Sequence, residues 1–251
     1  MIRIDFETID STNNKAKEIV LGSSYEDDQG NRMAGGVLPL LVTAQTQTGG
    51  RGRYGKTFYS PEGGIYMSYA YEKDYTEAEL LNVTTCVAEL VLPVLQTHTS
   101  KQLFIKPIND IYAIDVAQMN IDSTLDGNPA IYGSSVSDNE LTPEEYADAM
   151  IAAGAKKIVG ILTERVDYPR VGASQTCGAI GSSRTAQSIT AIQTPGYFVI
   201  VGIGININPQ PIPAGMTDAE GKPLEDIIGW LEPDCDRNTL IDEIAGALGE
   251  L

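Results

Sequence analysis

The chain has 251 residues, 42% of them hydrophobic, and a net charge of −17, because 34 acidic residues outnumber 17 basic ones. This length and apolar content suit a globular protein with a sizeable core rather than a disordered chain, and the acidic balance argues against a nucleic-acid partner, which needs clustered Lys and Arg. We also expect no membrane partner, because no apolar run approaches the roughly 20 residues that span a bilayer and the first residues do not resemble a signal peptide.

The first predicted elements are a strand and a helix. Apolar and charged residues alternate over 2–9, which indicates a half-buried strand. Asp10-Ser11-Thr12-Asn13 follows, and capping of the helix that begins there would be enough to explain this cluster. The polar stretch 22–36 predicts a loop, and 37–46 predicts a second strand.

Residues 47–57 hold four glycines and three cations in an otherwise acidic chain. Glycine lets backbone N–H groups approach a ligand closely, and arginine suits phosphate and carboxylate, so the stretch predicts an anion-binding loop. A solvated connection is the plainer interpretation. Gly50, Gly55, Lys56 and Thr57 also fit the Walker A spacing, but that loop must open a helix, and residues 58–64 contain Pro and two Gly.

A long helix follows the predicted strand 65–71. It begins at a capping-box pattern, Thr76-Glu77-Ala78-Glu79, and we expect a kink at Pro93. Its core-facing residues are predicted to be Leu80, Leu81, Cys86, Val87, Leu90, Val91 and Val94.

The rest of the chain mixes strands and helices. Residues 103–112 predict strand, turn and strand, and Asn109-Asp110 alone would be ordinary turn chemistry. Strands are predicted over 157–164 and 197–201, and helices over 143–153, 224–231 and 239–251.

Cysteine and histidine are sparse. Cys86, Cys177 and Cys235 form no Cys-x-x-Cys pair and predict neither zinc nor a disulfide framework. A reduced, cytoplasmic setting is the simplest fit. The single histidine, His98, cannot support a His-rich metal site, and we expect it on the surface at a helix end.

Five segments, in this order, resemble the motifs of the catalytic domain of biotin–protein ligases. They are Ser11-Thr12-Asn13; Gly50-Arg51-Gly52-Arg53-Tyr54-Gly55 with Phe58, Ser60 and Pro61; Lys106 with Asn109, Asp110 and Tyr112; the strand from Lys157 to Glu164; and Gly202-Ile203-Gly204-Ile205-Asn206. In the third segment, Pro107-Ile108 stands where the family has Trp-Pro. Chance would rarely supply all five in sequence.

The resemblance implies a fold of the α/β (α+β) class. It would contain a mixed, largely antiparallel sheet with helices packed on one face, as in class II synthetase-like biotin/lipoate ligases. Residues 1–251 would form a single catalytic domain with insertions at about 113–155 and 167–186. We expect no helix-turn-helix before Ile4 and no small C-terminal β-barrel.

The activity that the resemblance implies is ATP-dependent conversion of biotin to biotinyl-5′-AMP, followed by transfer to a lysine of a biotin carboxyl carrier protein domain. Biotin, ATP and Mg²⁺ would be bound, no protein residue is predicted to ligate a metal, and a homodimer is compatible. A lipoate-type acyltransferase of the same fold and a non-catalytic paralogue that binds biotin or its adenylate remain alternatives.

Roles for individual residues follow from the same resemblance. Lys157, Arg53 and Asp110 would be catalytic, with Lys157 at the biotin carboxylate and the α-phosphate and Asp110 orienting the incoming lysine or metal. The residues expected to hold biotin are Ser11, Thr12, Asn13, Gln47, Arg51 and Gly160. Those expected to bind the nucleotide are Gly50, Gly52, Arg53, Tyr54, Gly55, Lys56, Phe58, Lys106, Asn109 and Asn206.

Overall fold

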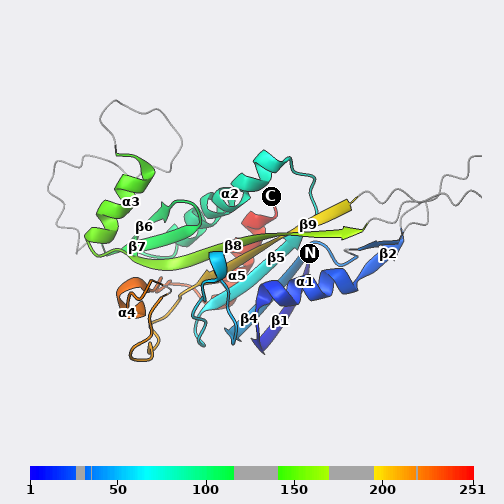
Figure 1. The fold of residues 1–251 in the computed structure, drawn as a ribbon. Helices are drawn as coiled ribbons and strands as arrows, with labels where there is room; N and C mark the ends of the chain where they lie inside the picture. The colour runs from blue at the N-terminus through cyan, green and yellow to red at the C-terminus, as the bar shows by residue number, and fades with distance from the viewer. Residues whose placement is uncertain (27–31, 35, 116–140, 170–194, 219) are drawn as a thin grey trace, which may run out of the picture.

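The computed structural model describes residues 1–26, 32–34, 36–115, 141–169, 195–218 and 220–251. Its centre is a seven-stranded sheet (Figure 1) in which only β1 and β4 pair in parallel among the described strands. In spatial order the strands are β1 (Ile2–Ile9), β4 (Leu40–Gln47), β5 (Ile65–Tyr71), β9 (Pro195–Ile205), β8 (Lys156–Pro169), β7 (Asp110–Ile114) and β6 (Gln102–Lys106). The predicted mixed, largely antiparallel sheet is therefore confirmed.

Helices cover both faces of this sheet. The helices α2 (Glu77–Gln96) and α5 (Arg237–Leu248) pack in the core cluster that includes Leu41 of β4, whereas α1 (Thr12–Gly22) packs against its neighbours Leu40 and Val42. Since successive strand residues point to opposite faces, α1 and the α2–α5 pair lie on opposite sides (Figure 1). The expectation of helices on one face alone is corrected.

A fourth helix, α3 (Pro143–Ala152), shares the face of α1. It packs through Ala147 and Met150 against Phe104 and Tyr112, whose sequence neighbours Leu103 and Ile111 point into the α2–α5 core. The α1 face thus carries two separate hydrophobic clusters, one over β4, β5, β8 and β9 and one over β6 and β7. The middle of β8 and β9 belongs to neither cluster.

Four of the seven residues predicted to face the core from α2 do so, because Val87 and Val91 are buried and Leu80 and Val94 pack partly buried against the same core. The capping box at Thr76 and Glu79 is present, and Pro93 lies inside the helix. Leu81 is 79% exposed and Cys86 is exposed, whereas the buried residues are Val83, Val87, Ala88, Val91 and Leu95. Apolar residues surround much of this helix, so its periodicity does not select a buried stripe. By length and composition α2 also qualifies as a membrane span, although one face of it packs in the core described here.

Two other expectations are corrected. Residues 22–36 include a small hairpin, β2 (Ser24–Glu26) with β3 (Arg32–Ala34), which is too short for its alternation to be seen in sequence. The predicted helix 224–231 is a single turn, α4 (Leu224–Ile227), because the next backbone groups bond to β8 and to the residue after β9. Gly229 N donates to Lys157 O, and Leu231 N donates to Asn206 O.

The two predicted insertions overlap regular elements. Residues 113 and 114 belong to β7, and residues 143–152 form α3. Residues 167–169 are the end of β8. Residues 116–140 and 170–186 of these two segments lie outside the described residues.

Candidate functional site

A cavity of about 770 Å³ opens on the sheet face between α1 and α3, within the roughly 300–1,000 Å³ range of small-molecule sites. Three glycines form its floor: Gly160 on β8 pairs with Gly204 on β9, and Gly202 is the next residue of β9 on the same face. The sheet is open here because these strands carry no side chains at the positions where large apolar residues would otherwise project.

The ring of Phe58 lies against this glycine floor. A Cβ atom on Gly160 would come 2.9 Å from Phe58 Cε2, and one on Gly204 would come 2.5 Å from Phe58 Cε1. Contacts that short do not occur between real carbon atoms, so the ring can take this position only above glycine. Phe58 therefore forms one wall of the cavity.

The predicted anion-binding loop folds as a hairpin over the cavity. Gly52 N donates to Lys56 O over 2.7 Å, and Phe58 N donates to Gly50 O over 2.9 Å. Tyr54 and Gly55 have positive φ angles of 56° and 74°. No helix follows within the described residues 56–64, and β5 comes next. The rejection of a Walker A loop is therefore confirmed.

One end of the cavity is neutral and polar. Thr12 N and Oγ1 donate to Gln47 Oε1 over 2.8 and 3.2 Å, and Gln47 Nε2 donates to Ser60 Oγ over 3.0 Å. The Ser68 hydroxyl, fully buried on β5, lies 2.8 Å from Thr12 Oγ1 and 2.5 Å from Asn13 Oδ1. These contacts fix the start of α1 against the loop and the sheet.

The polar cluster at the start of α1 is more than a cap. Ser11 is the N-cap residue, but its side chain makes no capping hydrogen bond. Ser11, Thr12 and Asn13 are nevertheless 2–4% exposed and line the cavity. Asn13 Nδ2 donates to Glu164 Oε2 over 2.7 Å, and Arg51 Nη2 lies 2.9 Å from the same oxygen. Glu164 thus joins the helix start to the glycine-rich loop.

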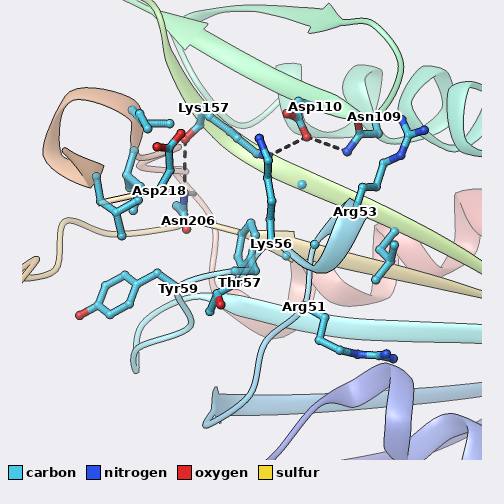
Figure 2. A pocket seen from close by; sticks show the side chains of 18 of the residues that line it. Arg51, Arg53, Lys56, Thr57, Tyr59, Asn109, Asp110, Lys157, Asn206 and Asp218 are labelled. Atoms are coloured by element: carbon cyan, nitrogen blue, oxygen red, sulfur yellow. Dashed lines mark hydrogen bonds and ion pairs between the residues drawn. The ribbon is translucent and has the colours of Figure 1, made fainter. Parts of the chain in front are cut away.

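A connected row of side chains forms the other end. Lys157 Nζ lies 2.7 Å from Asp110 Oδ1, Asn109 Nδ2 donates to that oxygen over 2.9 Å, and Arg53 Nη1 donates to Asn109 Oδ1 over 3.3 Å. Figure 2 shows this row from Lys157 to Arg53, with Arg51 pointing away from it. Both members of the Lys157–Asp110 pair are largely shielded from water, at 24% and 21% side-chain exposure, so their attraction is screened less than that of a surface pair.

Two further cations are held more loosely. Lys56 Nζ lies 2.6 Å from Glu220 Oε1, and this hydrogen bond raises the pKa of Lys56, but both groups are largely exposed. Such a pair contributes little to stability. Lys106 Nζ lies 3.8 Å from Asp148 and 5.8 Å from the ring centre of Tyr112. Burial, with a smaller contribution from Asp110, raises the pKa of Tyr112 to about 12, so its hydroxyl stays protonated.

Asn206 holds the strand backbone at the Lys157 end of the cavity. Its side-chain Nδ2 donates to Lys157 O over 3.3 Å, as Figure 2 shows, and its backbone N donates to Ile158 O over 2.9 Å. The residue is 5% exposed. Asn206 therefore fixes the backbone that carries Lys157.

The predicted site residues come together in this cavity with one exception. Gly50 lines an adjoining hollow beneath the loop, where a Cβ atom would collide with Phe58 O and Ser60 Oγ. The others all line the cavity: Ser11, Thr12, Asn13, Gln47, Arg51, Gly52, Arg53, Tyr54, Gly55, Lys56, Phe58, Lys106, Asn109, Asp110, Lys157, Gly160 and Asn206.

Several residues in or next to the cavity had no predicted role. Gly202 and Gly204, which belong to the fifth motif, form the floor, and two glycines at alternate positions of a strand were the available signal. Ser68 supports the neutral end, and a serine within the buried, apolar and aromatic β5 was the signal for it. Asp218 and Lys222 also line the cavity, from a loop that carries no recognisable pattern.

One protein-family model and several solved structures match this chain. Residues 38–182 match the model of the biotin/lipoate A/B protein ligase family. The structure is similar to that of the biotin protein ligase from Aquifex aeolicus in complex with biotin and ATP, with a TM-score of 0.51, 20% identity, and coverage of 99% of this chain and 69% of that one.

Two further similarities are lower in TM-score. For the biotin protein ligase from Leishmania major in complex with biotinyl-5-AMP the TM-score is 0.49, with 18% identity over 98% of this chain and 73% of that one. For the bipartite lipoate protein ligase from Thermoplasma acidophilum the TM-score is 0.44, with 10% identity over 100% of this chain and 83% of that one. At these identities the similarity concerns the fold.

Proposed function

Because the chain belongs to the biotin/lipoate A/B protein ligase family, we propose that it activates biotin with ATP to biotinyl-5′-AMP and transfers the biotinyl group to a lysine of a carrier domain. One observation carries the proposal: a single cavity joins a buried, neutral polar end to an end lined by Arg53, Lys106 and Lys157. An acid with a neutral, hydrogen-bonding head group, joined through its carboxylate to a nucleotide, has that distribution of polarity.

The neutral end favours biotin over lipoate. Hydroxyl and carboxamide groups gather there on Thr12, Asn13, Gln47 and Ser68, and such groups both donate and accept hydrogen bonds. The ureido ring of biotin also does both. The dithiolane ring of lipoate has no N–H or O–H group to donate, and its sulfur atoms are weak acceptors, so it complements such groups less well.

Adenylate formation needs positive charge more than a protein nucleophile. A biotin carboxylate oxygen attacks the α-phosphorus of ATP, the bond from that phosphorus to the bridging oxygen breaks, and pyrophosphate leaves with the electron pair. Two anionic groups must approach each other, and Lys157, held by Asp110 at 2.7 Å, is placed to offset their repulsion without reorganising.

The loop and the floor would hold the nucleotide. Arg53 reaches over the cavity from the hairpin, and Phe58 supplies an aromatic wall above the glycine floor. Mg²⁺ bound with ATP would neutralise part of the phosphate charge, and the carboxylates of Asp110, Asp218 and Asp226, which line the cavity, are oxygen donors of the kind that it takes.

In the second step the carrier lysine amine attacks the acyl carbon, the bond to the AMP oxygen breaks, and the amine releases a proton. We propose that Asp110, which holds Lys157, also orients the amine of the carrier lysine. A biotin carboxyl carrier protein domain as the acceptor, a cytoplasmic location and a homodimer remain predictions.

The experiment is biotin-dependent exchange of labelled pyrophosphate into ATP, with lipoate and acid-free reactions as controls. Exchange with biotin alone is the expected result. Exchange with lipoate alone would show that the protein activates lipoate instead of biotin. Biotin binding by calorimetry without exchange in either reaction would mean a binding protein that lacks the chemistry.

A further inference from the structure

The loop that follows α2 meets the loop that precedes α5 on the sheet face opposite the cavity. The meeting point holds His98, the single histidine of the chain, together with Asp234 and Cys235. A ring nitrogen, a carboxylate oxygen and the Cys235 sulfur lie within 4.8 Å of one another there. We propose that these three side chains bind one divalent transition-metal ion of the zinc type.

The donor set selects the class of ion. Mg²⁺ and Ca²⁺ take oxygen ligands, whereas zinc binds cysteine sulfur, histidine nitrogen and carboxylate oxygen in tetrahedral sites at about 2.0–2.3 Å. Ligand atoms in such a site are roughly 3.3–3.8 Å apart, so the present donors need only a small inward movement. Three protein ligands leave a fourth position for water.

The contacts of His98 have the form found around a ligating histidine. Nε2 lies 2.6 Å from Glu243 Oε2, and Nδ1 lies 3.0 Å from Asp234 Oδ1. A neutral imidazole carries only one N–H. In the ion-free site an imidazolium donates from both nitrogens. An ion that takes the Nδ1 lone pair would replace one of these protons and draw Asp234 to the same centre, while Nε2–H still donates to Glu243. Metal-bound histidines commonly donate their other N–H to a carboxylate, and Glu243 supplies it.

Backbone contacts hold the donors in place before any ion binds. Asp234 N donates to His98 O over 3.0 Å, and His98 N donates to Leu95 O over 3.1 Å. Asp236 caps α5 through hydrogen bonds from Asn238 N and Thr239 N. As predicted, His98 lies at a helix end, just after α2, and its side chain is partly buried, at 16% exposure. The donors therefore lie on the ends of two packed helices.

Binding leaves the cluster close to neutral. The Cys235 thiol loses its proton to solvent, and the thiolate and the Asp234 carboxylate together balance the two charges of the ion. The bound ion would connect residue 98 to residues 234 and 235, which are distant in sequence. It would thereby stabilise the packing of α2 on α5, which share the main hydrophobic core.

The test uses the full chain after chelator treatment, titrated with Zn²⁺ by calorimetry and with Co²⁺ by absorbance. We expect one ion per chain, a thiolate-to-Co²⁺ charge-transfer band, and a rise in Tm with Zn²⁺ that the chelator reverses. Cys235→Ser should abolish the band, and His98→Gln should weaken Zn²⁺ binding at least about tenfold. Glu243→Gln should weaken it by about tenfold through the loss of the outer carboxylate.

The matched control is the double variant Cys86→Ser/Cys177→Ser, which removes an exposed thiol of α2 and a thiol outside the described residues. It should keep the band and the affinity. Absence of the band in the parent protein, or its survival in Cys235→Ser, would overturn the proposal and leave an imidazolium between two carboxylates. Circular dichroism of each variant separates loss of binding from loss of fold.

Discussion

Gly160 and Gly204 pair directly across β8 and β9, and the ring of Phe58 lies against both of them. Glycine at these two positions lets an aromatic ring and the backbone of two central strands come into contact. The cavity is thus bounded on one side by peptide groups and on another by a flat apolar surface. An adenylate has a flat base and polar oxygens that suit such a boundary.

Gly204→Ala should weaken ligand binding without unfolding the protein. The added Cβ would lie 2.5 Å from Phe58 Cε1, so the ring must move into the cavity. We expect the Kd for biotin and ATP, measured by calorimetry, to rise at least about tenfold. Gly246→Ala on α5 is the matched control, because its Cβ would meet no atom within 4 Å. It should leave affinity unchanged and raise helix stability by about 1 kcal/mol. Equal affinities in both variants would contradict the role of the glycine floor.

Lys157→Met should slow adenylate formation by a factor of about 10²–10³, the usual effect of removing one preorganised charge-stabilising group. Methionine keeps the apolar stem and removes the ammonium that contacts Asp110. Single-turnover formation of biotinyl-5′-AMP is the measurement. The neighbouring Lys156→Met is the control, because Lys156 Nζ contacts Glu225 O instead. A parent-like rate in Lys157→Met would remove this lysine from the chemistry.

Asp110→Asn should lower both half-reactions. The carboxylate holds Lys157 at 2.7 Å and accepts from Asn109, so its neutralisation frees the lysine to move. We expect slower adenylate formation, and slower transfer when preformed biotinyl-5′-AMP is supplied with a carrier domain. The kcat of each step should fall more than the KM changes. Unaltered adenylate formation would mean that Lys157 needs no such partner.

Thr76→Ala should lower the free energy of unfolding by about 1 kcal/mol, because it removes the hydroxyl that caps α2. Thr76 Oγ1 accepts from Glu79 N, and Glu79 accepts in return from Thr76 N over 2.8 Å. Urea unfolding followed by circular dichroism measures the change. Asn82→Ala on the exposed side of the same helix is the control and should be neutral or slightly stabilising.

Glu79 should make this cap dependent on pH. Hydrogen bonds from the Thr76 backbone and then from its side chain lower the pKa of Glu79 below its usual 4.5. The depressed value means that the stabilisation is fully present above pH 4.5 and is lost as the pH falls through the lower folded-state pKa. Glu79→Gln should thus unfold more easily than the parent at pH 7, and the difference should vanish in acid. A difference that does not change with pH would refute this.

Several features of this protein could be predicted from the sequence because they depend on interactions between residues close together in the chain. The capping box at Thr76, the alternation of β1 and the glycines of the 47–57 loop depend on neighbours within a few residues. Backbone geometry and short-range hydrogen bonds decide such features. The motif spacing likewise identified the residues that meet in the cavity.

Only the tertiary structure decided which surfaces and charges meet. It buried Val83 instead of Leu81, placed α1 on the face opposite α2, and brought Lys157 to Asp110 and His98 to Cys235. These outcomes depend on the docking of segments far apart in the chain, where burial of apolar area outweighs local preference. The sequence shows which residue types are available for a site. The distances between their side chains are set only when the sheet assembles.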